Sequence, residues 1–438
     1  MNHPVAPVAP DAPDAPDLSP TVARRRGLRT GWTTGTCASA AAKAAYVALV
    51  SGRRLERVEV ALPSGQRVGF PVEWDGDGRA VVVKDAGDDP DCTDGARMTA
   101  EVRVGGTGGA HVLHAGEGIG TVTKPGLGLA VGEPAINPVP RRMILAALAE
   151  AGTEPVDVTF SVPGGEAMAE QTTNGRLGIL EGISILGTSG IVRPFSTASY
   201  RASVVQQIGV AAAQGARTVV LATGARSEAA AAALYPTLDP VCCIEVGDFT
   251  GIALRRAAYA GMRKVVFAGM PGKLAKLAAG EMMTHFQRSD VDTGLLGALA
   301  VEAGTPGAVV EAATETATAR HFFDVCMLHG CMEPLALLCE RARAACLAHA
   351  GSIFELEVVL VDYEGSSVLW RAGPEGTASD VCEMADFETP LHGRDTLAAW
   401  SSQRGDDRRV GRRPAHPRQG LTGAAGGDGG RGDRPGHP

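Results

Sequence analysis

A loop rich in glycine and threonine, Arg29 to Cys37, runs directly into a segment made mostly of alanine. The composition of residues 38–50 predicts a helix, so the loop would lie at a helix N-terminus. There the first backbone N–H groups lack partners within the helix, and the helix dipole adds positive potential. The pattern therefore favours a site for a phosphate or carboxylate group. The candidate binding residues of this segment are Arg29, Thr33, Thr34, Gly35, Thr36 and, within the predicted helix, Lys43.

Alternatives to an anion site remain open for this loop. Thr34 or Thr36 could simply cap the helix. The spacing G-x-x-x-x-G-K-[ST] is absent, so a Walker A loop is not indicated. Cys37 sits where a helix N-terminus would lower the pKa of a thiol, but no histidine lies nearby in the sequence to act as its base. We interpret Cys37 as a small packing residue, with a Cys37-dependent hydrolase as the alternative.

Two glycine-rich segments further along contain side chains suited to binding anions. Residues 116–142 hold many Gly and Pro residues, which fix one backbone path rather than a flexible linker. Residues 174–194 alternate apolar side chains with Gly, Ser and Thr, and their two arginines could clamp a carboxylate. A structural crossover or surface ion pairs would explain the same residues equally well. The candidate binding residues here are Asn137, Arg141, Asn174, Arg176, Thr188 and Arg193.

The ends of predicted parallel strands supply a further group of candidates. Ligands of open α/β sheets bind at the carboxyl ends of the strands, and Thr223, Asp248 and Lys273 follow such strands. His285 lies near the end of the helix predicted over residues 273–286, and it is our candidate general base. His285 could equally cap that helix or pack in the core.

Cysteine usage indicates reduced thiols rather than a disulfide framework. The nine cysteines are an odd number without paired spacing. One local group contains no C-x-x-C pair, so a structural zinc site is not indicated. We expect these thiols to pack in the core, no metal to be held by protein ligands, and the protein to be cytoplasmic. The group consists of Cys326, His329, Cys331, Cys339 and Cys346.

Two kinds of domain would position these candidates. Residues 23–152 are predicted to form an α+β domain. Residues 153–387 change to strand–helix alternation, which is typical of a larger α/β domain with a mostly parallel sheet covered by helices. The expected strands of the first domain are 58–62, 68–72, 80–84 and 100–104, and its helices 38–50 and 140–150. The expected strands of the second are 156–160, 217–223, 242–246, 264–268, 354–363 and 367–371, and its helices 202–214, 227–234, 250–260, 273–286, 295–302, 309–316 and 335–349.

Composition limits the class of protein. The chain has 438 residues, 45% hydrophobic and 21% charged, which is ordinary for a globular protein of two domains. Its Pro/Ala/Asp-rich start, 1–22, and its Gly/Pro/Arg-rich end, 388–438, are expected to be disordered. The start lacks the apolar region of a secretory signal, and no run of about 18 apolar residues predicts a membrane span.

Charge argues against nucleic acid as a general partner. The formal net charge is −8. Residues 404–438 hold eight Arg and four Asp, a net charge of +4, which leaves the rest of the chain near −12. A basic RNA-binding tail is the alternative interpretation of those arginines. An acidic protein that takes an anionic ligand must concentrate its positive groups locally.

Four blocks in collinear order resemble one family, the cobalt-precorrin-5B C(1)-methyltransferases of the anaerobic cobalamin pathway. The resemblance covers about residues 27–371. Trp32 stands where the family often has Tyr, and Gly175 where it often has Pro; both differences concern loop shape. The blocks are RTG with TTGTC (29–37), GEPAINPVPR (132–141), RLGI with GISILGT (176–188), and GKL with the later Thr-His pair (272–285).

The resemblance implies transfer of a methyl group from S-adenosylmethionine to ring carbon C-1 of cobalt-precorrin-5B, giving cobalt-precorrin-6A. Cobalt would arrive inside this tetrapyrrole substrate. No G-x-G-x-x-G opens the first strand–helix turn, so the donor site is not assigned by a motif. The ring carries many acetate and propionate groups, which backbone N–H groups and a few Arg or Lys would have to hold. A non-catalytic corrinoid-binding carrier is the alternative.

Overall fold

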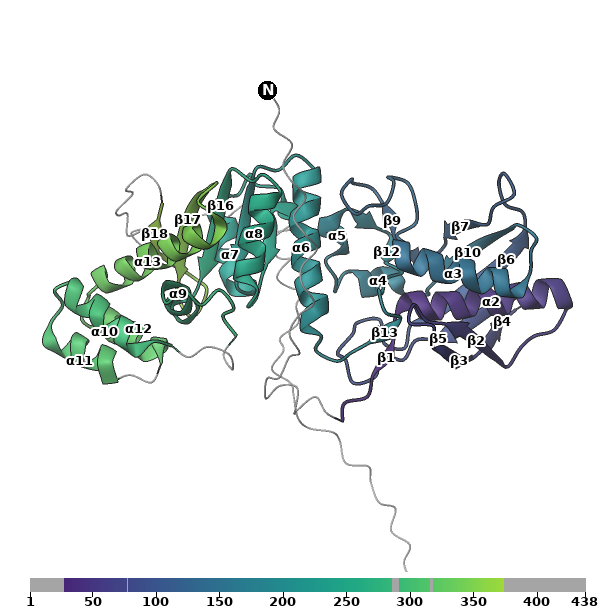
Figure 1. Ribbon diagram of the computed structural model, residues 1–438, viewed down its shortest axis with the longest axis horizontal. Helices are drawn as coiled ribbons and strands as arrows, with labels where there is room; N and C mark the ends of the chain where they lie inside the picture. Colours follow the sequence, from purple (N-terminus) through teal and green to yellow (C-terminus); the bar gives the residue numbers. More distant parts are fainter. Residues whose placement is uncertain (1–26, 77, 286–290, 316–317, 374–438) are drawn as a thin grey trace, which may run out of the picture. The chain divides into compact units, whose positions relative to one another are not determined.

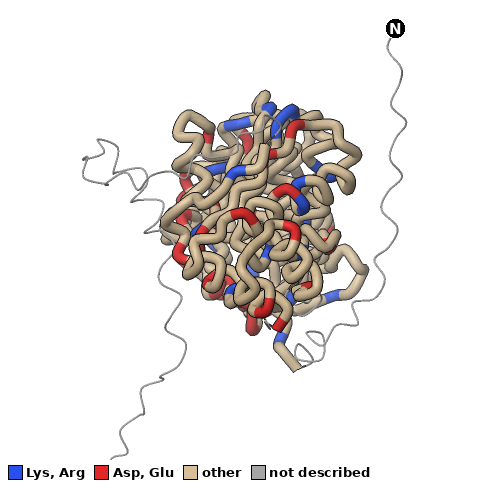
Figure 2. Tube along the Cα trace, turned by 90° about the vertical axis from the view of Figure 1, so that its left-hand side faces the viewer, with Lys and Arg blue, Asp and Glu red and all other residues tan. Residues whose placement is uncertain are grey.

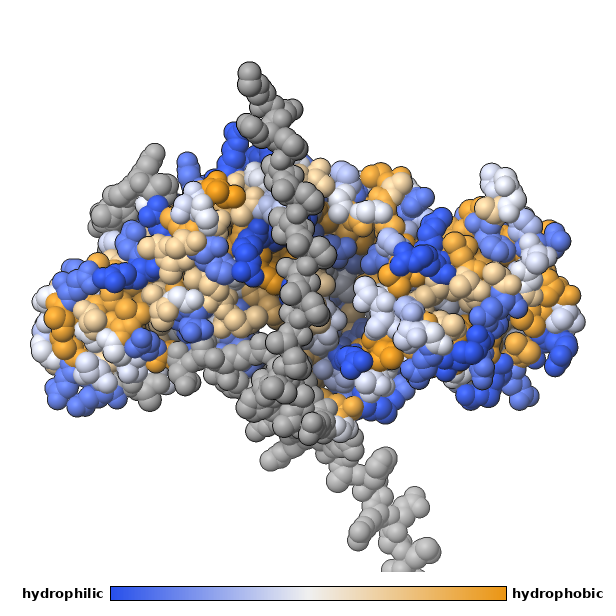
Figure 3. All heavy atoms as spheres, in the orientation of Figure 1, coloured by the Kyte–Doolittle hydropathy of each residue, from blue (hydrophilic) through white to orange (hydrophobic). Residues whose placement is uncertain are grey.

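The computed structural model describes residues 27–76, 78–285, 291–315 and 318–373 (Figure 1). They belong to one compact unit. None of the helices in these ranges has both the length and the apolar character needed to cross a membrane. The segments predicted to be disordered lie outside the described residues. Acidic and basic residues are interspersed along the trace on the side shown in Figure 2, and hydrophobic residues are mixed with hydrophilic ones on the face shown in Figure 3.

The first sheet has five strands in the order β4-β5-β6-β10-β7, antiparallel except for the parallel pair β10 and β7. Helix α2 packs on β5 and β6 and lies beside α3 (Figure 1). Its many alanines are buried, and such small side chains allow close packing against neighbours. The elements are β4 (Glu73–Asp75), β5 (Arg79–Val83), β6 (Arg97–Val104), β7 (Val112–Ala115), β10 (Val156–Ser161), α2 (Thr34–Ser51), α3 (Pro138–Ala151), and a separate hairpin of β2 (Arg57–Ala61) and β3 (Arg67–Pro71).

Strand β10 corrects one prediction from the sequence. Residues 156–160 were expected to open the α/β domain, but β10 pairs with β6 and β7 of the first sheet. Val156, Val158 and Phe160 are fully buried while the residues between them are half-buried. That alternation is typical of a strand with one face on a core, whereas central parallel strands are apolar throughout. A domain boundary at residue 153 would separate this strand from its sheet.

Two short ladders join residues 118–122 to residues 179–183, and a third joins residues 31–32 to residues 191–192. Gly118 lies where the chain also passes close to Val162: its φ is +71°, and a Cβ there would overlap the carbonyl oxygen of Val162. The neighbouring Gly165 likewise has no room for a Cβ beside Gly118. Only glycine fits two backbones at this separation. The ladders are β1 (Gly31–Trp32) with β13 (Ile191–Val192), β8 (Gly118–Ile119) with β12 (Gly182–Ile183), and β9 (Thr121–Val122) with β11 (Ile179–Leu180), flanked by α4 (Gly165–Ala169) and α5 (Asn174–Leu177).

The second sheet confirms the expected parallel sheet covered by helices. Its order is β15-β14-β16-β17-β18, with only β18 antiparallel. The central strands are buried almost throughout, as both faces of the sheet are covered. The elements are β14 (Thr218–Ala222), β15 (Cys243–Glu245), β16 (Lys264–Gly269), β17 (Glu355–Val361), β18 (Val368–Ala372), α6 (Thr197–Ala213), α7 (Ala225–Leu234), η1 (Pro240–Cys242), α8 (Thr250–Tyr259), α9 (Pro271–Ala278) and α13 (Glu333–Ala350).

Three further helices follow α9, and two of them match the predicted ones. They are α10 (Thr293–Glu302), α11 (Gly307–Glu315) and α12 (Ala319–Leu328), of which α12 was not predicted. The helix predicted over 273–286 is wrong in length, because α9 ends at Ala278. Gly280 has a φ of +87°, which a continuing helix cannot accommodate. The chain then folds back along Asp248 and Gly251, where Gly251 N–H donates to the carbonyl of Met282 at 3.0 Å.

Two large hydrophobic cores underlie these sheets, and neighbouring residues of one segment contribute to both. Leu177 and Ile179 are buried in the core of the second sheet. Ile183 and Ile185, a few residues later, are buried in the core of the first. The segment 174–194 is therefore anchored on both sides of its short ladders, which fixes the loop that follows them.

Candidate functional site

The loop Thr30 to Cys37 is bound to the segment 184–190 by its own polar groups. The N–H groups of Thr33 and Gly35 donate to the carbonyls of Gly190 and Leu186, each at 3.1 Å. The Thr33 hydroxyl accepts from the N–H of Thr36 and so caps α2. The expectation that these N–H groups are unpaired is therefore wrong: neighbouring backbone carbonyls occupy the donors that an anion would need.

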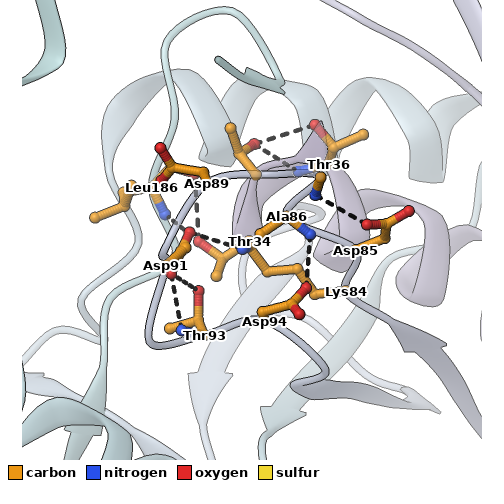
Figure 4. A network of polar contacts seen from close by, with 12 residues as sticks. Thr34, Thr36, Lys84, Asp85, Ala86, Asp89, Asp91, Thr93, Asp94 and Leu186 are labelled. Atoms are coloured by element: carbon orange, nitrogen blue, oxygen red, sulfur yellow. Dashed lines mark hydrogen bonds and ion pairs between the residues drawn. The ribbon is translucent and has the colours of Figure 1, made fainter. Parts of the chain in front are cut away.

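The hydroxyls of this loop are engaged in the same way. Thr34 Oγ1 donates to the carbonyl of Ser184 at 3.1 Å and accepts from Leu186 N–H at 2.9 Å. Thr36 Oγ1 donates to the carbonyl of Gly190 at 2.7 Å. Figure 4 shows Thr34 and Leu186 side by side at the start of α2. The two motif blocks thus fix each other, and Thr33 is the loop residue that also faces a cavity.

The two basic residues of the first block pair with carboxylates instead of facing the cavity. Arg29 is exposed and bonds the Asp85 carboxylate. Lys43 Nζ donates to the Glu59 carbonyl at 2.8 Å and pairs with Glu150 at 2.5 Å. Arg29 and Lys43 therefore hold the α2 region to its neighbours, and the structure brings neither of them to the cavity lining.

The cavity has a volume of about 770 Å³, within the range of small-molecule sites. Its lining combines apolar surface with hydroxyls, three carboxylates, an arginine and a histidine. Of the residues predicted from the sequence, it brings together Thr33, Thr188, Arg193, Asp248 and His285. The full lining is Thr33, Asp89, Asp91, Leu186, Gly187, Thr188, Ser189, Ile191, Val192, Arg193, Phe195, Ser196, Thr197, Ala198, Ser199, Tyr200, Gly247, Asp248, Phe249 and His285.

Two of the carboxylates that line the cavity, those of Asp89 and Asp91, belong to the loop 85–94. Asp91 accepts from the buried Lys84 ammonium at 2.7 Å, and from both the N–H and the hydroxyl of Thr93 (Figure 4). Burial opposes ionisation of Asp91, but these donors outweigh it and lower its pKa. Asp89 accepts from the N–H of Phe195 at 2.8 Å. Each carboxylate thus has a donor from the protein.

The third carboxylate, Asp248, is held at the end of β15. Its Oδ1 accepts from Lys273 Nζ and lies 3.4 Å from the hydroxyl of Thr284. Lys273 also donates to the Thr284 hydroxyl at 3.2 Å. Thr284 is buried, and it fixes the chain just before His285. Lys273 therefore belongs to this cluster, although it does not line the cavity.

Arg193 supplies the cavity lining with a positive charge that is available to a ligand. Its side chain is exposed and makes no ion pair with any residue in the described ranges. The three carboxylates of the lining already have donors, so they do not compete for it. An anionic ligand entering this cavity would meet Arg193 together with the hydroxyls of Thr188 and Ser189.

The remaining candidates lie elsewhere. Asn174 bonds the carbonyl of Gly182 at 3.0 Å and accepts from Ser184. Arg176 pairs with Glu228 at 2.5 Å. Thr223 Oγ1 lies 3.3 Å from Ser227 Oγ. The other two belong to α3, where Asn137 occupies the N-cap position and Arg141 the first turn.

Several lining residues were not predicted from the sequence. They are Asp89, Asp91, Phe195, Tyr200 and Phe249. Tyr200 stacks on Phe249 with ring centroids 5.6 Å apart, and Phe195 is 55% exposed. One signal was available: aromatic residues make up only 4% of the chain, so two of them close to Arg193 in the sequence are unusual.

Cys37 is completely buried, and burial raises the pKa of its thiol to about 12. The thiol therefore stays protonated at neutral and mildly alkaline pH, and a reagent cannot reach it in the folded protein. We expect iodoacetamide at pH 8 to leave Cys37 unmodified in the native protein and to modify it in urea, as mass spectrometry of tryptic peptides would show. Rapid modification in the native state would contradict the packing role and favour a Cys37-dependent hydrolase.

Comparison with known proteins gives consistent matches. Residues 21–194 match the family model CbiD, and residues 283–372 match CbiD, C-terminal domain. A protein of Salinispora arenicola named cobalt-precorrin-5B C(1)-methyltransferase is 55% identical over 364 residues, which are 81% of this chain and 96% of the relative. One of the same name from Rubrobacter xylanophilus is 55% identical over 359 residues, 79% of this chain and 92% of the relative.

One solved structure is also similar in sequence. It is a crystal structure of the cobalamin biosynthesis protein cbiD from Archaeoglobus fulgidus. It shares 31% identity with this chain and has a TM-score of 0.34, covering 59% of this chain and 82% of that one.

Proposed function

This chain belongs to the CbiD family of cobalt-precorrin-5B C(1)-methyltransferases, and on that premise we propose that the cavity around Arg193 and Asp248 is its active site. The protein is a methyltransferase of cobalamin biosynthesis that methylates C-1 of cobalt-precorrin-5B to give cobalt-precorrin-6A. Every relative named above that carries this name is aligned over more than nine-tenths of its own length.

The methyl donor is, in this proposal, S-adenosylmethionine, and cobalt enters as part of the substrate. The C–S bond of the sulfonium breaks with its electron pair going to sulfur, which becomes a neutral thioether, while an electron pair of the ring at C-1 forms the new C–C bond; the positive charge passes to the ring and leaves it only with a proton. The sulfur of the donor loses its positive charge during this transfer. The main task of the protein is to align the two reacting carbons. A cavity of about 770 Å³ lined by both apolar and hydroxyl groups suits that task.

Arg193 carries the proposal, because the ring substrate is a polycarboxylate. An exposed arginine without an ion pair among the described residues can form two parallel hydrogen bonds to a side-chain carboxylate of the ring. The engaged carboxylates Asp89 and Asp91 lie on the same lining, where their donors reduce repulsion of the substrate. His285 lines the same cavity and is our candidate base if the ring must lose a proton.

All eight cysteines of the described residues are free thiols. This supports a reducing compartment such as the cytoplasm for the reaction.

The function is tested by incubating the purified full chain, without oxygen, with S-adenosylmethionine labelled in its methyl group and with cobalt-precorrin-5B. Label should appear on the ring, at C-1 by NMR. Binding of the ring without any transfer would instead identify a corrinoid-binding carrier, and would overturn the methyltransferase.

Replacing Arg193 by alanine is expected to raise the KM for cobalt-precorrin-5B about tenfold or more, because a charge-assisted hydrogen bond contributes about 1.5–3 kcal/mol. The change in kcat should be smaller, since the contact is present both before and during transfer. Initial rates at several substrate concentrations give both constants. Arg142→Ala removes an exposed arginine from α3 that lies outside the cavity lining, and serves as the control. Equal effects of the two changes would contradict the role of Arg193.

A further inference from the structure

The cavity has two walls of different chemistry. One wall, from Thr188 to Thr197, offers hydroxyls and Arg193. The other is built at the carboxyl end of β15, by Gly247 to Phe249, with Tyr200 of α6 against it. The first wall suits the carboxylates of the ring, and the second offers an aromatic surface and a carboxylate. The ring and the methyl donor need different binding groups, so each of the two substrates can be assigned to one wall.

The position of the second wall is one where α/β sheets bind ligands. Strand β14 lies between β15 and β16 in the sheet. The chain therefore runs from β14 to its neighbour on one side, β15, and then crosses to its neighbour on the other side, β16. Ligands bind at the carboxyl ends of strands beside such a reversal of strand order. In dinucleotide-binding sheets an acidic residue after the second strand accepts hydrogen bonds from a ribose. Asp248 follows β15, the strand that comes after β14 in this sheet.

Asp248 has one oxygen committed to the protein and one available. Its Oδ1 accepts from Lys273 Nζ, while its Oδ2 accepts no hydrogen bond from the residues that the structure describes. Lys273 therefore orients the carboxylate through Oδ1, and Oδ2 is the oxygen left for a ligand of the cavity that Asp248 lines. A carboxylate held in this way is an acceptor for hydroxyl groups, which the ribose of an adenosine supplies and the carboxylates of a corrinoid do not.

The aromatic pair beside Asp248 is also held in place. The Tyr200 hydroxyl donates to the carbonyl of Glu245 at 3.2 Å. Gly247 has a φ of +55°, and a Cβ there would lie 3.1 Å from that hydroxyl, so glycine allows the ring to approach β15 closely. Tyr200 stacks on Phe249 yet is 39% exposed. A fixed, partly exposed aromatic surface is a stacking surface for a planar heterocycle such as adenine.

We infer that the Gly247–Phe249 wall is the subsite for the adenosine part of the methyl donor, with the free oxygen of Asp248 accepting from the ribose hydroxyls and Tyr200 contacting the adenine. This rests on the proposed function, because the donor's identity comes from it. The subsite adds to that function that the two substrates occupy different sides of the cavity, the donor on the β15 side and the ring on the Arg193 side. The methyl group is then delivered across the cavity between them.

The test measures binding of S-adenosylhomocysteine and of its 2′-deoxyribose analogue to the full chain by calorimetry. The wild-type protein is expected to bind the analogue about tenfold more weakly, because one hydrogen bond to the carboxylate is missing. In Asp248→Asn the affinity for S-adenosylhomocysteine should fall, and the ratio between the two ligands should shrink to about two or less. A ratio that stays near tenfold in Asp248→Asn overturns the assignment.

Three further variants separate binding from structural effects. Lys273→Met keeps the carboxylate but removes the ion pair that orients it, so the ratio between the two ligands should fall only partway, to between the wild-type value and that of Asp248→Asn; an unchanged ratio would contradict the orienting role of Lys273. Tyr200→Leu should weaken both ligands equally, and Arg193→Ala should leave both unchanged. If the wild-type protein transfers the methyl group normally but the affinity ratio of the two ligands stays near tenfold in Asp248→Asn, only this subsite is refuted. A chain that neither transfers the methyl group nor binds S-adenosylhomocysteine refutes the proposed function as well.

Discussion

Replacing Arg176 by alanine is expected to lower the free energy of unfolding by about 3–5 kcal/mol, because it removes one partner of a buried ion pair. Arg176 Nη1 pairs with Glu228 at 2.5 Å, and the two side chains are 12% and 0% exposed. The same guanidinium donates to the Cys243 carbonyl at 3.1 Å. The alanine variant therefore leaves the Glu228 carboxylate in the interior without this guanidinium. Urea denaturation followed by circular dichroism measures the change.

Two further variants show whether the buried charge causes the loss. Arg141→Ala removes a half-buried arginine that makes no ion pair with the described residues, and should cost less than about 1 kcal/mol. The double change Arg176→Met with Glu228→Leu removes both charges and should recover most of the stability, since an apolar pair needs no charge partner. A loss below about 1 kcal/mol in Arg176→Ala would mean that the pair is not buried in solution.

Replacing Gly118 by alanine is expected to cost about 2–5 kcal/mol. The left-handed conformation at φ +71° costs an alanine about 1–2 kcal/mol. Overlap of the new Cβ with the backbone at Val162 and Gly165 forces a shift that costs about 1–3 kcal/mol more. The midpoint and slope of urea denaturation provide the measurement.

Gly128 offers a matched control for Gly118. Its φ is +72°, almost the same, but no atom lies within 4 Å of a Cβ placed there. Gly128→Ala should therefore carry only the backbone cost of about 1–2 kcal/mol. The difference between the two variants isolates the steric overlap. If the two lose the same stability, the close crossing of the chain at Gly118 is refuted.

Most helices and strands could be predicted because their cause is local. The alanines of α2 and the apolar runs of β14 and β16 determine those elements within a few residues. The pairing of β10 could not be predicted, because strand partners depend on distant residues. Its Val156 pairs with Val104, and no local pattern carries that information.

The candidate site was partly predictable for the same reason. Arg193 and Asp248 stood out by residue type beside glycine-rich segments, and both line the cavity. Arg176 was selected on the same grounds, but its partner Glu228 lies on α7, far away in the sequence. The loop at Thr33 was expected to present free N–H groups, since the carbonyls of Leu186 and Gly190 that accept from it are invisible without the fold.

The pairing of β1 with β13 also determines when the cavity can form. Gly31 pairs with Val192, and Thr33, two residues after Gly31, lines the cavity together with residues that follow Val192. A chain is synthesised from its N-terminus, so β1 and the neighbouring Thr33 have no pairing partner until residue 192 has left the ribosome. Contacts between residues so distant in sequence form slowly, and incomplete sheets expose apolar surface meanwhile. The cavity is therefore a late product of folding, although Thr33 of its lining is among the earliest residues to be made.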